Sequence, residues 1–231
     1  GLSLRTADSV VAVSSKTQAD VQRYFGVESS AARIGVDFEV PVRSSTAESD
    51  NLKTEIRIRR PFVLYVGSDR PHKNLAIINE VAQRGFESLG YSFVFAGCHP
   101  GFENSNILEL GYVDDHMLEY LYSEASAFVL PSWCEGYGLP VGEALLRGVP
   151  VAVSTGGALN EFRATPGVSM FDPSDAEGMV SAIGESIALR SEISSTKLKA
   201  TVSRYLGWEQ HLEMLGRICR KLSSPRRPDC D

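Results

Sequence analysis

The sequence predicts an α/β fold with a doubly wound parallel sheet, and three observations support this. Short, nearly continuous apolar runs recur along the chain, as in strands covered on both faces. Each ends in a glycine or serine turn, and most precede a stretch with helical periodicity. Because parallel neighbouring strands need crossover connections, this alternation favours a parallel sheet. The clearest runs are PFVLYVG at 61–67, YSFVFAG at 91–97, SAFVLPS at 126–132 and VPVAVST at 149–155.

Before these runs, the first 43 residues predict one strand and one helix. DSVVAVSS at 8–15 is an apolar strand, and SSKTQADVQRYFG at 14–26 has a serine N-cap, a helical period and a terminal glycine. Residues 44–60 are polar without an apolar face, which predicts a linker or mobile loop. We place the domain boundary in this stretch or slightly before it.

The principal domain is predicted to cover residues 61–206, followed by a C-terminal helix and tail at 207–231. Its expected helices lie at 73–85, 114–125, 140–148 and 176–190. In the last helix of the chain, an apolar stripe recurs at helical spacing and predicts core packing. The stripe consists of Trp208, Leu212, Leu215, Ile218 and Leu222.

Composition narrows the classes of function. The chain has 231 residues, of which 43% are hydrophobic and 23% charged, and a net charge of -6, which argues against nucleic-acid binding. The apolar runs are too short to span a bilayer, and residues 1–20 lack a signal-peptide pattern. A cytoplasmic protein is expected, with a peripheral position at the inner membrane face as the second expectation. The four cysteines lack metal-ligand spacing, so we interpret them as mostly structural thiols.

Candidate chemistry lies in the loops after the strands, because ligands of open α/β sheets bind beyond the carboxyl ends. In WCEGYGLPVGE at 133–143, Gly136, Gly138 and Pro140 predict a tight turn into a helix start, which suits a phosphate. Glu135 and Glu143 flank this turn and would repel the same phosphate. They therefore predict neutral hydroxyls on both sides of it, as in a nucleotide sugar.

A second loop, GSDRPHKN at 67–74, supplies the cations. Arg70 or Lys73 could neutralise a diphosphate leaving group, whereas we expect His72 to be exposed rather than catalytic. There is neither a Walker-type glycine loop nor an acidic metal cluster in the sequence, which suggests metal-free handling of a diphosphate. Taken singly, Lys73 is better interpreted as a surface residue, Glu143 as a helix-dipole partner, and Gly136 and Gly138 as turn residues. For Cys134, which lacks a paired histidine, packing is the preferred interpretation.

At these residues the sequence resembles the retaining glycosyltransferases of family 4, also called group 1, in which two Rossmann-like domains form the GT-B architecture. EGYGLPVGEALLRGVPVAVSTGGALNE at 135–161 matches the two-glutamate signature and the glycine-rich loop after it. YVGSDRPHKNL at 65–75, FAG at 95–97 and LGYVDDHMLEYLYSEASAFVLPS at 110–132 match in the family's order. The chain resembles mostly the C-terminal, donor-binding half, with 1–43 as a remnant of the N-terminal domain.

The resemblance implies a role for each matching residue. Glu135 would approach the donor hexose, with the backbone of Gly136, Tyr137, Gly138 and Leu139 near the sugar and diphosphate. Glu143 would hold the ribose. The basic pair of Arg70 and Lys73 would stabilise the departing diphosphate, and Val113 would lie at the nucleobase. Further candidate donor-binding residues are Gly67, Ser68 and Gly97. Many relatives have arginine where this chain has Ser68.

The resemblance implies transfer of a hexose with retention, in polysaccharide or lipopolysaccharide biosynthesis, to a glycan or lipid-linked acceptor. Mannose from GDP-mannose is the first expectation, and a UDP-linked sugar is the alternative; no cofactor and no metal are expected. A complete acceptor-binding domain is lacking, so a missing N-terminal domain or a partner chain is expected and the isolated chain should transfer poorly. The same residues also fit a noncatalytic donor-binding or scaffold subunit of a split enzyme, or a GT-B-like epimerase or phosphorylase.

Overall fold

The computed structural model describes residues 2–36, 61–84 and 90–223, without the side chains of residues 204, 205 and 210. The chain forms two compact units, and each is described by itself. The smaller comprises Gly1–Asp37 and Leu206–Asp231, and the larger comprises Phe38–Tyr205. The predicted linker at 44–60 lies outside the described residues.

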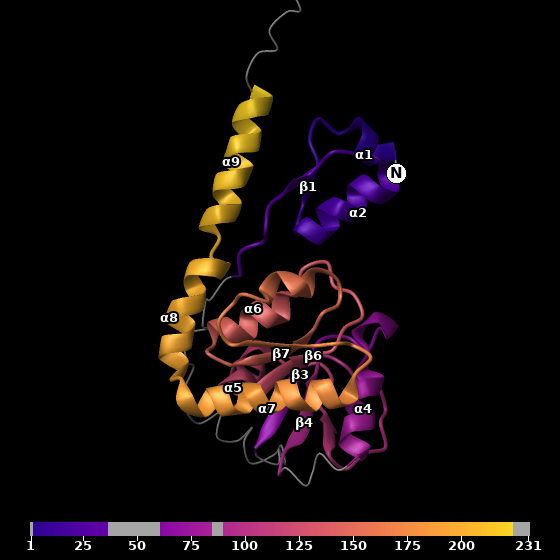
Figure 1. Cartoon of the computed structure of the whole chain (residues 1–231), viewed down its shortest axis with the longest axis vertical. Helices are drawn as coiled ribbons and strands as arrows, with labels where there is room; N and C mark the ends of the chain where they lie inside the picture. The colour runs from indigo at the N-terminus through magenta and orange to yellow at the C-terminus, as the bar shows by residue number, and fades with distance from the viewer. Residues whose placement is uncertain (1, 37–60, 85–89, 224–231) are drawn as a thin grey trace, which may run out of the picture. The chain divides into compact units, whose positions relative to one another are not determined.

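The larger unit is built on a parallel sheet, with the strand order β5-β4-β3-β6-β7-β8 among its described residues (Figure 1). Every neighbouring pair of these strands is parallel. The α/β fold class predicted from the apolar runs is therefore confirmed. The strands are β3 (Phe62–Val66), β4 (Ser92–Ala96), β5 (Ile107–Glu109), β6 (Ala127–Leu130), β7 (Val151–Ser154) and β8 (Val168–Phe171).

The strand order reverses between the two central strands. From β3 the chain proceeds outward through β4 and β5, then returns to place β6 against the other side of β3 and continues outward through β7 and β8. Val63 pairs with Ala127, and Leu64 pairs with Phe128. A reversal of this kind is the topological switch point, where open α/β sheets bind their ligands at the carboxyl edge.

Helices cover both faces of this sheet. Helix α7 packs along β6, β7 and β8 and beside α4, while α6 lies on the other face (Figure 1). The larger unit contains α4 (Leu75–Gln83), α5 (Asp115–Glu124), α6 (Leu139–Leu146), α7 (Ala176–Glu192), nearly all of α8 (Ser195–Leu206), and the short 3-10 helices η1 (Pro71–Lys73) and η3 (Gly157–Phe162). None of the helices in the described ranges is both long and apolar enough to cross a bilayer.

The smaller unit contains the predicted N-terminal strand and helix. Ser14 caps the helix by accepting a hydrogen bond from the Thr17 amide at 3.0 Å, and Gly26 ends it in a left-handed conformation, φ 64°. The strand is shorter than expected and pairs in parallel with a second short strand. The elements are α1 (Leu2–Thr6), β1 (Val11–Ala12), α2 (Ser15–Phe25), β2 (Ser30–Ala31) and α9 (Glu209–Ser223).

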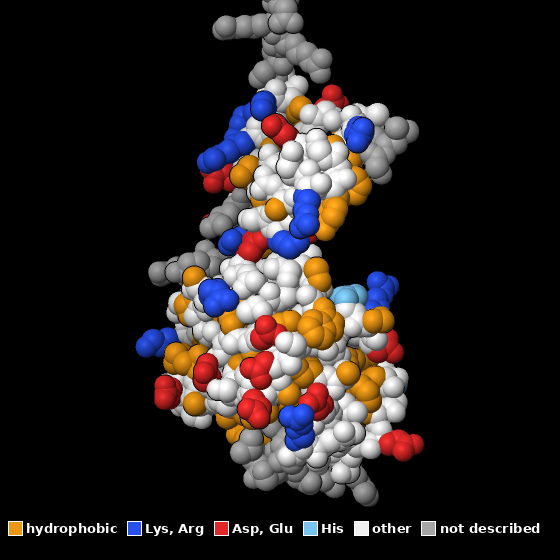
Figure 2. Space-filling view, turned by 45° about the vertical axis from the view of Figure 1, so that its right-hand side comes forward, with side chains coloured by type: hydrophobic (Ala, Val, Ile, Leu, Met, Phe, Trp, Pro, Cys, Tyr) orange, Lys and Arg blue, Asp and Glu red, His pale blue; other side chains and the backbone are white. Residues whose placement is uncertain are grey.

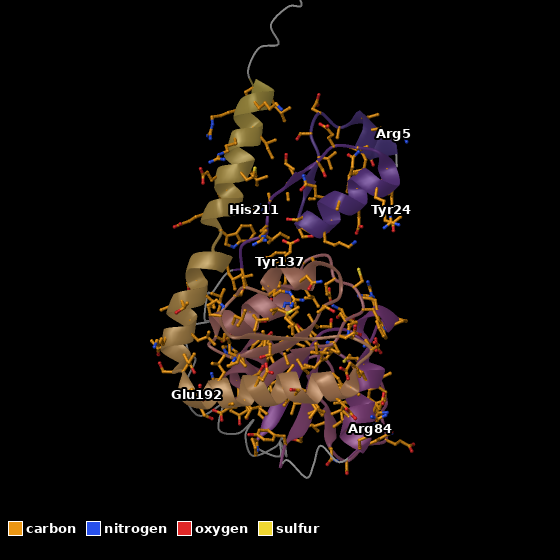
Figure 3. The ribbon with its side chains drawn as sticks, in the orientation of Figure 1. Arg5, Tyr24, Arg84, Tyr137, Glu192 and His211 are labelled. Atoms are coloured by element: carbon orange, nitrogen blue, oxygen red, sulfur yellow. The ribbon has the colours of Figure 1, made fainter. Side chains whose placement is uncertain are left out.

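The prediction of core packing along the last helix is wrong for part of the stripe. The side chains of Leu212 and Leu222 are 61% and 52% exposed. One contact of α9 within the smaller unit lies near its start, where Nδ1 of His211 is 3.0 Å from the Arg33 carbonyl oxygen (Figure 3). Helical periodicity identifies an apolar face correctly but cannot tell whether that face has a partner.

Candidate functional site

The loops that follow β3 and β6 lie side by side at the switch point. The amide of Trp133, in the loop after β6, donates a hydrogen bond to the His72 carbonyl oxygen at 2.8 Å, in the loop after β3. Parallel strands bring their following loops to the same edge of a sheet. The two sequence motifs singled out above, 67–74 and 133–143, are thereby joined at one place in the fold.

The contact between Lys73 and Glu135 dominates this place. Lys73 Nζ lies 2.6 Å from Glu135 Oε1, and the two side chains are only 14% and 12% exposed. The hydroxyl of Ser132, a buried residue, donates to the same Oε1 at 2.7 Å. The acid beside the helix start is thus neutralised by the cation that was expected to hold the diphosphate, and both interactions fix the carboxylate through one oxygen.

Asn74 ties the loop after β3 to two other loops. It has φ 56° and is the one non-glycine residue with positive φ in the described part of the chain. Its side-chain amide donates to the carbonyl oxygens of Pro131 at 3.1 Å and Pro173 at 2.8 Å. Sequence reasoning missed Asn74 and Ser132, although both lie in quoted motifs. The available signal for Asn74 was the tolerance of asparagine for left-handed backbone after a short helix.

The glycine-rich loop after β7 supports Glu135 from its backbone side. Gly157 has φ 63°, and a Cβ there would lie 2.6 Å from the Glu135 carbonyl oxygen. The same oxygen accepts a hydrogen bond from the Ala158 amide at 2.9 Å. At Gly156, a Cβ would lie 2.2 Å from the Ser132 carbonyl oxygen. Only residues without a side chain allow this approach, so the loop holds both Ser132 and Glu135 in place.

The two glycines of the turn into α6 differ in conformation and surroundings. Gly138 is the N-cap, with φ 99°, and Pro140 lies in the first helical turn as expected. Gly136 is exposed, and a Cβ there would meet open space among the described residues. Tyr137, labelled in Figure 3, packs its ring against Phe162 with centroids 5.6 Å apart. Its side chain therefore belongs to the core, which leaves its backbone as the candidate contact.

Glu143, in the second turn of α6, contacts a helix that the sequence did not link to it. The buried Tyr122 of α5 donates its hydroxyl hydrogen to Glu143 Oε2 at 3.1 Å. Burial, and next the charge of Glu143, raise the pKa of Tyr122 well above its usual value, so the phenol stays protonated and serves as the donor. Sequence reasoning missed Tyr122 as well, because its spacing matches an ordinary core position.

Gly67, Ser68 and Gly97 meet at the ends of β3 and β4. A Cβ at Gly97, which has φ 93°, would lie 3.0 Å from the Gly67 carbonyl oxygen. The hydroxyl of the buried Tyr65 donates to the Ser68 carbonyl oxygen at 2.7 Å and thereby shapes this loop. The three candidates, predicted from two separate motifs, are therefore neighbours at the carboxyl edge.

Arg70 and Val113 each lie at or next to the start of a helix. Arg70 is exposed at the start of η1, and Val113 is half-buried just before Asp114, the N-cap of α5. His72 is exposed, as expected. The expected packing of Cys134 is wrong, since this residue is exposed.

The remaining described cysteines differ in environment. Cys219 is exposed as well, whereas Cys98 is buried. Burial, followed by the charges of Asp69 and Glu109, raises the pKa of the Cys98 thiol to about 11. Of the described thiols, only Cys98 therefore fits the interpretation of the cysteines as mostly structural.

A pocket of about 540 Å³ lies between α5, the end of α6 and α8. It holds the ion pair of Arg147 with Glu119, and Lys199, whose pKa is lowered mainly by burial and then by Arg147. Its lining residues are Glu119, Ser123, Arg147, Ser195, Thr196, Lys199, Ala200 and Ser203. None of the predicted donor residues lines it.

Charged and hydrophobic side chains share one face of the larger unit (Figure 2). The face of the larger unit seen in Figure 2 carries acidic, basic and hydrophobic side chains intermixed. Large hydrophobic side chains exposed in this unit are Tyr112, Trp133 and Leu139. Within the stretches that the structure describes, no three His, Cys, Asp or Glu side chains are grouped so as to hold a metal ion.

Comparison with known proteins gives a consistent result. The family model for Glycosyl transferases group 1 matches residues 60–188. O-antigen chain mannosyltransferase B of Escherichia coli is 32% identical over 168 residues, which is 64% of this chain and 42% of that protein. Serotype-specific mannosyltransferase WbdA of the same species is 27% identical over 96% of this chain and 30% of its own length. The chain thus spans less than half the length of either relative.

Two solved structures share the fold at lower identity. Sucrose-phosphate synthase from Thermosynechococcus elongatus gives a TM-score of 0.72 at 22% identity, covering 95% of this chain and 59% of that one. Anabaena Alr3699/HepE, solved in complex with UDP and glucose, gives a TM-score of 0.76 at 17% identity, covering 96% of this chain and 65% of that one. These likenesses confirm the GT-B type of fold expected from the resemblance. Since the family model spans more than half of the sequence, this chain belongs to the Glycosyl transferases group 1 family.

Proposed function

We propose that the chain is the donor-binding part of a retaining hexosyltransferase that uses a nucleotide sugar. The observation that carries this proposal is the ion pair of Lys73 and Glu135 at the switch point, 2.6 Å between Nζ and Oε1, beside the start of α6. It combines a cation, an acid and a glycine turn where open α/β sheets bind nucleotides. Glu143 lies about one helical turn after the start of α6.

In this proposal the parts of the donor are distributed over the loops. Backbone groups of 136–139, together with Lys73 and Arg70, face the diphosphate, whose departure needs positive charge. Glu135 accepts hydrogen bonds from the hexose, and Glu143 accepts them from the ribose. Gly67, Ser68 and Gly97 contact the donor at the ends of β3 and β4, and Val113 lies at the nucleobase. We propose no metal, because these side chains and amides supply the stabilising charge.

The first donor that we propose is GDP-mannose. Two relatives that are 32% and 27% identical to this chain over the aligned residues are named mannosyltransferases. Their names support mannose as the sugar. A UDP-linked sugar is the second candidate, supported by the complex of Alr3699/HepE with UDP and glucose. The proposed acceptor is a glycan or lipid-linked glycan held by a missing N-terminal domain or a partner chain.

A noncatalytic donor-binding subunit is the second candidate function, because the same candidate residues could bind a donor without an acceptor site on the same chain. Donor and acceptor must be held together for transfer to be fast. If the chain is such a subunit, transfer appears only when a separate acceptor-binding chain is added. If it is part of one enzyme, the parent protein transfers the sugar by itself.

Calorimetric titration of the chain with GDP, UDP and ADP tests the proposed function. We expect saturable binding of one of the three with a stoichiometry near one, and tightest binding for GDP. Absence of binding to every nucleoside diphosphate would overturn the donor site. Tighter binding of UDP than of GDP would retain the site and replace the proposed sugar donor.

A further inference from the structure

Tyr122 occupies a fixed position between two side chains. Its ring lies under the Arg147 guanidinium, whose Cζ is 4.8 Å from the ring centroid, and beside the Phe128 ring, at 6.2 Å between centroids. The side chain is fully buried. A ring confined in this way has one accessible rotamer, so its hydroxyl points in one direction.

Arg147 holds this arrangement together from the end of α6. Its Nε donates to Glu119 Oε1 of α5 at 2.8 Å, and its Nη1 donates to the Glu143 carbonyl oxygen at 3.1 Å. Glu119 and Tyr122 are three residues apart on α5 and therefore share one helical face. The arginine thus joins the backbone of Glu143 to the helix that carries Tyr122.

The hydroxyl of Tyr122 reaches one oxygen of the Glu143 carboxylate. It donates to Oε2 at 3.1 Å, which leaves Oε1 to accept from a ligand. A long, flexible glutamate side chain otherwise loses rotamer entropy when it binds a hydroxyl group. Holding one oxygen in advance reduces that loss, which is how preorganisation raises affinity.

We propose that Tyr122 is a positioning residue that orients Glu143 toward the ribose hydroxyls and so makes the site select ribonucleotides. This inference rests on the proposed function, since it assumes that a nucleotide binds at Glu143. Tyr122 acts through the glutamate and touches no reacting atom. Its removal should weaken the recognition of the ribose and leave the recognition of the diphosphate unchanged.

The test compares GDP and UDP, each with its 2′,3′-dideoxy analogue, on the 231-residue chain. Wild type should bind the ribose form of its nucleotide at least about tenfold more tightly than the dideoxy form. Tyr122→Phe should reduce this preference roughly fivefold or more by raising the Kd of the ribose form alone. Ser186→Ala is the matched control. It deletes another fully buried hydroxyl, which donates to the Ala182 carbonyl oxygen at 2.9 Å, and should keep the wild-type preference.

A double-variant cycle separates positioning from a general structural effect. In the Glu143→Ala background, Tyr122→Phe should change the ribose preference no further, because the carboxylate that it orients is gone. An equal loss of affinity for ribose and dideoxy forms in Tyr122→Phe would overturn the inference, as would an unchanged preference. If wild type binds neither nucleotide, the proposed function itself fails. Thermal unfolding of each variant verifies that the compared chains are folded.

Discussion

Lys73 and Glu135 lie 62 residues apart in the sequence and meet at the switch point, with 2.6 Å between Nζ and Oε1. The pair explains why an acid can flank a helix start that suits an anion. Because Lys73 neutralises Glu135 before any ligand binds, the carboxylate need not repel a nearby phosphate. A donor that enters this site must share the lysine with the glutamate.

Replacing Lys73 should therefore affect both stability and binding. Lys73→Met leaves a mostly buried carboxylate with Ser132 as its remaining described hydrogen-bond donor. We expect the free energy of unfolding to fall by about 2 kcal/mol, which urea denaturation would measure. Affinity for the nucleoside diphosphate should fall about tenfold or more in calorimetry.

Two variants control this experiment. Lys16→Met breaks an exposed pair with Asp20 on α2, whose side chains are 44% and 36% exposed, and should cost less than about 1 kcal/mol. Lys73→Met combined with Glu135→Gln removes the unpaired charge and should regain stability without regaining nucleotide affinity. Equal destabilisation by Lys16→Met and Lys73→Met would show that the switch-point pair is no more than a surface ion pair.

The close approach at Gly157 gives a second prediction. Gly157→Ala forces a Cβ to within 2.6 Å of the Glu135 carbonyl oxygen at a left-handed position, φ 63°. We expect a loss of about 2 kcal/mol in the free energy of unfolding, and weaker donor binding because Glu135 moves. Gly184→Ala is the control, since it lies inside α7 with open space around its Cβ position among the described residues.

The two glycine variants should change the free energy of unfolding in opposite directions. Gly184→Ala adds a good helix former and should stabilise the chain by about 0.5 to 1 kcal/mol. Thermal denaturation of both variants provides the comparison. A Gly157→Ala chain as stable as wild type would mean that the loop after β7 relaxes freely and does not hold Glu135.

Thiol labelling offers a footprint of the candidate site. Cys134 is exposed next to Glu135, whereas Cys98 is buried, with a pKa raised to about 11 that leaves little thiolate at pH 8. We expect iodoacetamide at pH 8 to modify Cys134 and to spare Cys98, as followed by peptide mass spectrometry. The nucleotide sugar should slow the labelling of Cys134.

Cys219 is the internal control for this footprint, because it is exposed on α9, in the smaller unit. Its labelling rate should not change when the ligand is added. Equal protection of Cys134 and Cys219 would indicate a general effect of the ligand on the reagent. No protection of Cys134 at a saturating concentration would place the donor elsewhere.

The sequence predicted those strands whose apolar runs are long and buried on both faces. β3 and β4 are fully covered over nearly their whole length and were found, as were β6 and β7. β5 and β8 lie at the edges of the sheet. β5 has three residues and β8 has four, and most of these residues are only half-buried. Such short, partly exposed segments lack the continuous apolar signal on which the prediction depended.

The sequence predicted which loops form the site, but it did not predict which side chains contact each other there. Topology placed the loops after β3 and β6 together, but the sequence assigned Lys73 and Glu135 to different parts of a ligand. Their direct pairing depends on side-chain geometry across adjacent loops, which no local pattern encodes. Tyr122 escaped notice because its hydroxyl meets Glu143 from another helix, while its helical spacing is that of a core residue.

The assignment of one donor molecule to these loops is tested most directly by calorimetry. The titrations compare the binding of GDP and of GDP-mannose to wild type, Glu135→Ala and Glu143→Ala. Glu143→Ala should weaken both ligands about equally, by roughly tenfold, because both carry the ribose. Glu135→Ala should weaken GDP-mannose selectively, because only that ligand carries the hexose. If both variants bind both ligands with wild-type affinity, the assignment of one donor molecule to these loops is contradicted.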